Sequence, residues 1–202
     1  AIGADRGDVL GVTFINFLAP GLISMQVIQQ SFSHSSSSFM IGKIQGNIVD
    51  LLYAPLSATE VTISVAFAAV TRSVMIAIIS IIVFKLIIDI EITNYFLLIV
   101  FTLLSSFILG NIGIIAGLWA EKFDHMATVT NFVIVPLSFL SGTFYSIDRL
   151  PEILQIVSKA NPFFYMIDGF RDSFIGQADG SITIGLVYLP ILSVVSCFIT
   201  YL

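Results

Sequence analysis

Five long apolar segments occupy most of the chain, at residues 13–32, 61–88, 95–118, 127–145 and 182–202. Each approaches or exceeds the roughly 20 residues that a helix needs to cross about 30 Å of hydrocarbon. In lipid every backbone N–H and C=O must be paired within the protein, and these segments are continuously apolar rather than alternating, so helices are predicted and not barrel strands. The pattern predicts an all-α polytopic membrane protein with five transmembrane helices.

The composition supports this class and excludes others. Of the 202 residues 57% are hydrophobic and only 10% are charged, with a mean hydropathy of +1.02, whereas soluble domains carry about 25% charged residues. The net charge of −5 gives no basic surface, so nucleic-acid binding is not indicated. A single cysteine, Cys197, excludes a disulfide or metal framework. The chain is therefore predicted to be one transmembrane domain over residues 1–202, embedded in a lipid bilayer.

A short amphipathic helix is predicted at residues 47–55, between the first two apolar segments. Asn47 is a good N-cap, Asp50 lies in the first turn where the helix dipole favours an anion, and Pro55 ends the helix. Its apolar face is made of Ile48, Leu51 and Leu52. Such a helix either lies in the lipid interface or inserts into a groove on a soluble partner. The absence of Lys and Arg from this helix speaks against the lipid interface.

Polar residues also occur within and beside the apolar segments. The serine run at 33–38 is predicted to be a polar exit from the first span, with His34 as a solvated loop residue. Arg72 and Lys85 are 13 positions apart in the second segment, which is about 20 Å along a helix. They either extend toward the two membrane faces, or Arg72 holds a carbonyl or a substrate. Asn111 lies among the closely spaced glycines Gly110, Gly113 and Gly117, which predicts close helix packing and an interhelical hydrogen bond.

The last connection is predicted to form a helical hairpin at residues 148–174. Before it, Gly142, Phe144 and Tyr145 resemble a membrane interface. The first helix, 150–159, is expected to begin with Asp148 as cap and Pro151 in its first turn.

Asn161 and Pro162 are expected to end the first hairpin helix and start the second one, 163–174. This second helix, which includes Tyr165 and Arg171, is too short to span and too apolar for a free loop. The hairpin is therefore predicted to dip into the membrane edge. Arg171 is expected either to cap the helix, to pair with Asp168 or Asp172, or to help gate an exit or meet an anionic substrate headgroup.

No known catalytic motif is visible in the sequence. A Walker A loop, HExxH, a Ser-His-Asp grouping and paired intramembrane carboxylates are all missing. The chain is thus predicted to bind no cofactor or metal and not to be an enzyme, and energy for any transport has to come from another subunit.

Several sequence stretches together resemble one protein family. They are residues 17–23, 50–56, 120–124, 136–146, the pairs Leu150-Pro151 and Asn161-Pro162, and residues 164–171. In order and spacing they are similar to the permease subunit of type-2 ABC exporters, in the bacterial branch of nodulation-factor and multidrug exporters. The family has six spanning helices, so the resemblance implies a fragment that lacks the first helix and the C-terminal tail.

The resemblance also implies roles and partners. It places residues 47–55 in the cytoplasm as a coupling helix that docks on a separate ABC ATPase, which binds ATP and Mg²⁺. Two permease copies are expected to enclose the substrate path in the bacterial inner membrane. The hairpin then lies outside, and residues expected to help close the path are Gly142, Phe144, Tyr145, Pro151, Asn161, Pro162, Tyr165 and Arg171. The alternative from a different class is a membrane-embedded enzyme or assembly factor without a nucleotide-binding partner.

Overall fold

The structure is a computed structural model that describes residues 9, 11–88 and 90–201, without the side chains of Leu51, Leu52 and Arg149. The regular secondary structure of these residues is helical, apart from one β-bridge between Val9 and Val12. The long helices are α1 (Phe14–Gln45), α3 (Ala58–Ile87), α4 (Tyr95–Trp119) and α9 (Ile182–Tyr201). The shorter ones are α2 (Ile48–Tyr53), α5 (Phe123–Val129), η1 (Thr130–Ile134), α6 (Val135–Leu140), η2 (Ile147–Arg149), α7 (Glu152–Ala160) and α8 (Pro162–Ile175).

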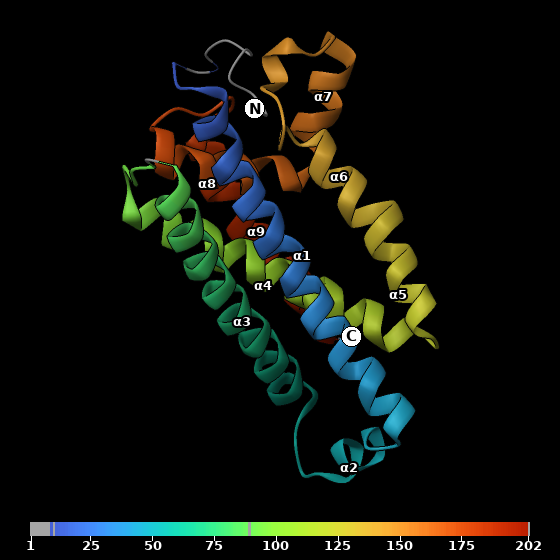
Figure 1. Cartoon of the computed structure of the whole chain (residues 1–202). Helices are drawn as coiled ribbons and strands as arrows, with labels where there is room; N and C mark the ends of the chain where they lie inside the picture. The colour runs from blue at the N-terminus through green and yellow to red at the C-terminus, as the bar shows by residue number, and fades with distance from the viewer. Residues whose placement is uncertain (1–8, 10, 89, 202) are drawn as a thin grey trace.

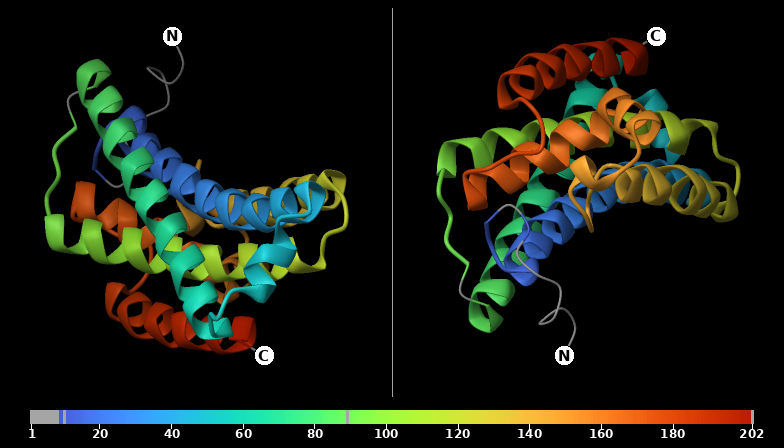
Figure 2. Two further views of the ribbon diagram at one scale, coloured as in Figure 1. Left: turned by 90° about the horizontal axis from the view of Figure 1, so that it is seen from below. Right: turned by 90° about the horizontal axis from the view of Figure 1, so that it is seen from above.

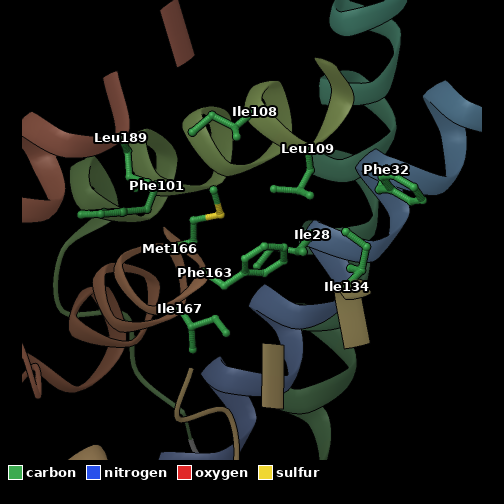
Figure 3. Packing of buried hydrophobic residues seen from close by; sticks show 10 residues of the cluster. All are labelled: Ile28, Phe32, Phe101, Ile108, Leu109, Ile134, Phe163, Met166, Ile167 and Leu189. Atoms are coloured by element: carbon green, nitrogen blue, oxygen red, sulfur yellow. The ribbon is translucent and has the colours of Figure 1, made fainter. Parts of the chain in front are cut away.

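Helix α4 is the centre of the bundle. It packs on α1, α3, α8 and α9, and its most extensive contact is with α1 (Figures 1 and 2). The largest apolar cluster joins α1, α4, η1, α8 and α9 through Ile28, Phe32, Phe101, Ile108, Leu109, Ile134, Phe163, Met166, Ile167 and Leu189 (Figure 3). Helices α2 and α7 lie at opposite ends of the molecule (Figure 1).

Glycines allow α1 and α4 to touch through their backbones. A Cβ on Gly113 would lie 2.5 Å from the carbonyl oxygen of Phe32, and one on Gly117 would lie 2.7 Å from that of Ser36. The predicted close packing is thus confirmed. The predicted interhelical hydrogen bond of Asn111 is wrong for the described residues, because its Nδ2 donates to Phe107 O of its own helix at 3.1 Å and its Oδ1 has no described partner.

Four of the five predicted spans are confirmed by helix length and hydropathy: α3, α4, the continuous helix Phe123–Leu140, and α9. Helix α1 has 32 residues, yet it falls outside this set because its second half is polar. The prediction that residues 33–38 leave the helix as a loop is wrong. The hydroxyls of Ser36 and Ser38 donate to carbonyls one turn earlier, so these serines are compatible with a continuous helix. The buried hydroxyl of Ser35 has no partner among the described residues. Helix α1 ends only at Gly46, whose φ of +76° closes its C-terminus.

The fourth span contains a π-helical turn, η1, directly before Pro136. Proline lacks an N–H and its ring clashes with the carbonyl four residues earlier, so a regular α-helix cannot pass through it unchanged. The wider turn at Thr130–Ile134 absorbs this mismatch without breaking the helix. The helix also begins and ends several residues earlier than the predicted 127–145.

The connection between α6 and α9 contains two helices, α7 and α8, close to those predicted. Asn161 caps α8, because its Oδ1 accepts the N–H of Phe163 at 3.1 Å, and Pro162 is the first residue of α8 as expected. At α7 the prediction is wrong in detail. Pro151 precedes the helix instead of lying in its first turn, and Asp148 belongs to the separate turn η2. Helix α8 has 14 residues, about 21 Å, and is mostly buried.

Gly113→Ala should separate α1 from α4, because the new methyl group meets the Phe32 carbonyl and the Ser35 Cβ. We expect a loss of about 1–3 kcal/mol of stability, typical of overpacking. Gly42→Ala is the matched control, since its Cβ would meet only Ile48 at 3.9 Å. Unfolding of the purified protein by heat in detergent measures both variants. Equal stability of the two would contradict the backbone contact.

Candidate functional site

The first candidate site is the turn around α2, which joins α1 to α3 at one end of the bundle (Figure 1). Asp50 lies in the first turn as predicted, and Ala54 is extended before Pro55, so the helix ends at Tyr53. The predicted side-chain cap by Asn47 is wrong. Asn47 has helical backbone angles, and its Nδ2 donates to Gln45 Oε1 at 3.2 Å.

The apolar face of α2 differs from the prediction. Ile48 is half-buried against the cluster of Phe39, Ala66 and Ile114, so it faces its own chain. The side chains of Leu51 and Leu52 lie outside the described residues. The apolar side chains that this segment exposes are Val49, Tyr53 and Leu56, with Tyr53 86% exposed.

Both flanks of this turn are fixed by hydrogen bonds. Ser57 and Glu60 form a capping box at the start of α3, with Ser57 N donating to Glu60 Oε2 at 2.7 Å. Lys43, near the end of α1, donates from Nζ to Gly117 O and Ala120 O at 3.0 Å each, and also to Leu118 O. A cation there satisfies the free carbonyls at the C-terminus of α4. Sequence reasoning missed this role of Lys43.

The second candidate site is a buried polar cluster at the opposite end, around Arg171 of α8. Only 1% of this side chain is exposed. Its Nη2 donates to Gly142 O at 2.6 Å, its Nη1 lies 3.7 Å from Asp179 Oδ2, and its guanidinium lies 4.0 Å from the centre of the Phe17 ring. Of the two predicted partners, neither Asp168 nor Asp172 forms this ion pair. Asp179, in the connection to α9, does.

Two carboxylates tie the surrounding loops together. Asp168 accepts the N–H groups of Asp179 at 2.8 Å and Gly180 at 2.9 Å. Asp179 accepts the hydroxyl of Ser146 at 2.5 Å and the N–H of Ile147 at 3.2 Å. Burial raises the pKa of Asp168 to about 6, although the two N–H groups and the Arg171 charge oppose that rise. Burial also lowers the pKa of Arg171.

The other residues that were predicted to help close the path make separate contacts. Gly142 adopts φ +80°, and a Cβ there would lie 3.0 Å from Tyr145 O. Phe144 packs edge-on against Phe139 with ring centres 5.0 Å apart. Tyr165 packs on Tyr188 of α9 at 5.3 Å. Tyr145 is half-buried, which raises its pKa. Pro151 lies farther out at the start of α7. Gly142 is thus joined directly to Arg171, and the aromatic residues pack around the helices that carry the cluster.

The predicted intramembrane charge, Arg72, lies in the middle of α3. Residues 58–71 of the helix precede it and 73–87 follow. Its Nη1 lies 3.1 Å from Nδ1 of His34 in α1. The structure thus places the exposed Arg72 side chain in contact with α1. Lys85, in the last turn of α3, does occupy a position near a helix end.

Comparison with known proteins identifies the family. Residues 6–175 match the family described as ABC-2 type transporter. The chain belongs to this family. It is 33% identical over 178 residues to the inner membrane transport permease YadH of Escherichia coli (strain K12), covering 88% of this chain and 70% of that protein. It is 25% identical over 202 residues to nodulation protein J of Rhizobium leguminosarum bv. viciae, covering 96% of this chain and 75% of that protein.

Membership confirms the resemblance read from the sequence. This chain is a membrane subunit of an ABC transporter and a multi-pass inner membrane protein. The family consists of transport subunits rather than enzymes, so the alternative of a membrane-embedded enzyme is set aside. Members normally pair with an ABC ATPase.

Replacing Arg171 should destabilise the protein strongly, because Asp168 and Asp179 would remain buried without a cation. We expect Arg171→Ala to cost about 3–5 kcal/mol, as for other broken buried pairs. Adding Asp179→Asn to Arg171→Ala should cost less than the sum of the two single changes. Lys159→Ala, an exposed cation of α7, is the control. Thermal unfolding in detergent measures the series, and strict additivity would argue against the pair.

The raised pKa of Asp168 predicts a dependence of stability on pH. Because the folded-state pKa of about 6 exceeds the ordinary value of 3.8, the folded state holds its proton more tightly. The stabilisation is complete below pH 4 and is lost as the pH rises through about 6. The melting temperature should therefore fall between pH 4 and 7, and Asp168→Asn should flatten this fall. A wild-type profile that rises over the same window contradicts the assignment.

Proposed function

We propose that this chain forms half of the membrane part of an ATP-driven exporter. Two copies enclose the substrate path, and each docks through α2 on a separate ATPase subunit that binds ATP and Mg²⁺. The name of the related YadH, an inner membrane transport permease, supports a transport role, and that of nodulation protein J supports membership of the same branch.

The exposed apolar residues of the α2 segment carry the proposal. Val49, Tyr53 and Leu56 are exposed on the connection between two long helices, beyond the packed bundle. Apolar side chains that are grouped outside the membrane mark a surface that binds a partner. A short helix with such a face suits insertion into a groove on a soluble partner. The segment carries no Lys or Arg between residues 47 and 56, which makes attachment to anionic lipid less suitable.

Helix α1 is suited to carry movement from α2 to the outer end. It is about 48 Å long, and Gly46 is the only residue between its last turn and Asn47. At one end Lys43 holds the C-terminus of α4, and at the other Phe17 lies under the Arg171 guanidinium. A displacement of α2 by the ATPase would thus act on the buried polar cluster through one continuous helix. In this proposal α7 and α8 form a re-entrant outer hairpin that closes the path.

Tyr53→Asp should uncouple the two subunits, because a charge replaces the most exposed apolar side chain of the segment. We expect normal membrane insertion, at least tenfold less co-purifying ATPase, and loss of ATP-dependent export. Tyr53→Phe, which keeps the apolar surface, should behave like the unchanged protein. Pull-down of the ATPase with the tagged permease measures both. Full ATPase binding by the Asp variant would refute α2 as the docking helix.

A further inference from the structure

Helix α1 has a polar face that its own chain leaves uncovered. Its exposed or half-buried members are Gln26, Gln30, Ser33, His34, Ser37 and Ser38. Four of them are spaced at i, i+4, i+7 and i+11, which places them along one side of a helix. The opposite side packs into the core through residues such as Ile28 and Phe32. Helix α1 runs along one side of the molecule between α3 and the α5–α6 helix (Figure 1).

Arg72, near the middle of α3, adds a charge beside this polar face. Ser73, its neighbour, bonds to Ser31 of α1 at 2.5 Å, and Ala69, one turn away, packs against Gly110 of α4. About 20 Å of α3 lies on either side of Arg72. Where α3 crosses hydrocarbon, a charge near its middle is unfavourable unless it is paired or solvated. A charged residue at this depth belongs against protein or a water-filled path.

The arrangement of Arg72 and His34 leaves hydrogen-bond donors available. A guanidinium has no acceptor atom, so Nδ1 of His34 must accept, which leaves the imidazole neutral with its proton on Nε2. Within the described part of the chain no carboxylate pairs with Arg72, and no acceptor is bonded to its other N–H groups or to Nε2 of His34. Arg72 is exposed, so these donors are open to a ligand beside α1.

We propose that Arg72 and His34 bind an anionic group of the transported substrate, next to the polar face of α1. The guanidinium fork binds two oxygens of a phosphate, sulfate or carboxylate, and the imidazole Nε2–H donates to a third acceptor. The glutamine amides and serine hydroxyls of α1 offer donors and acceptors to a polar body attached to that group. This inference rests on the proposed function, since it makes the polar face of α1 a wall of the path, and it specifies the substrate class as anionic.

The test uses the full complex in nanodiscs of phosphatidylcholine and measures equilibrium binding without ATP. Radiolabelled decyl phosphate is the probe, and decyltrimethylammonium, with the same chain and opposite charge, is its comparison. We expect at least tenfold tighter binding of decyl phosphate. Arg72→Gln should abolish this preference, Arg72→Lys should keep part of it, and Lys85→Gln, the other cation of α3, should leave it unchanged.

The site would be refuted if the protein showed no preference for decyl phosphate, or if that preference survived in Arg72→Gln. It would also be refuted if the two permease copies separated in Arg72→Gln, because the arginine would then belong to a subunit contact. Repeating the binding measurement in nanodiscs with 30% phosphatidylglycerol distinguishes a substrate site from a lipid site. Unchanged binding of decyl phosphate supports a site inside the path, whereas strong competition by the anionic lipid assigns the site to lipid headgroups. Because no ATP is used, loss of anion binding is distinguishable from the loss of ATPase docking measured with Tyr53→Asp.

Discussion

The structure depends on how closely α1 and α4 approach each other. In a membrane, helices gain little from burying apolar surface against one another, so association relies on packing and hydrogen bonds. Gly113 and Gly117 bring the α4 backbone against the carbonyls of Phe32 and Ser36, and no larger residue fits there. This contact places the serine-rich half of α1 within the bundle, so that one side of it is buried and the other is left uncovered. The polar half of α1 can therefore remain helical because its buried side packs closely against α4.

The two ends of α1 are held by different chemistry. At the α2 end, Lys43 satisfies the last carbonyls of α4, which fixes the position from which the short helix projects. At the other end, Phe17 lies under the Arg171 guanidinium, and the carboxylates of Asp168 and Asp179 bind the backbone of two connections. A buried ion pair of this kind adds little net stability, but breaking it is costly. It therefore favours one defined arrangement of the connections at this end of the molecule.

The middle of the molecule carries a polar surface formed by α1 and Arg72 of α3. Four helices are apolar enough to face lipid over their length, whereas α1 combines a buried apolar side with glutamines, serines and His34 on the other. Arg72 extends that polar surface onto α3. In a bilayer such a surface is stable only against protein or water. In the exporter that we propose, two such chains would provide both, because each copy would cover the other around an aqueous path.

The sequence by itself determined the class, the family and most helix positions, because continuous apolar runs have few stable forms in lipid and because proline, glycine and asparagine mark helix ends locally. The caps at Asn161 and Pro162 were predictable for this reason. Tertiary structure alone decided the path of residues 33–38, since these residues continue a helix that packs closely against α4, with hydroxyls such as those of Ser36 and Ser38 bonded within the helix. It also decided the partner of Arg171, because Asp179 is close only after the connection folds back over α8. The Arg72–His34 contact could not be predicted from the sequence for the same physical reason. These residues are 38 positions apart, so their contact depends on how two helices pack, which the local sequence pattern does not encode.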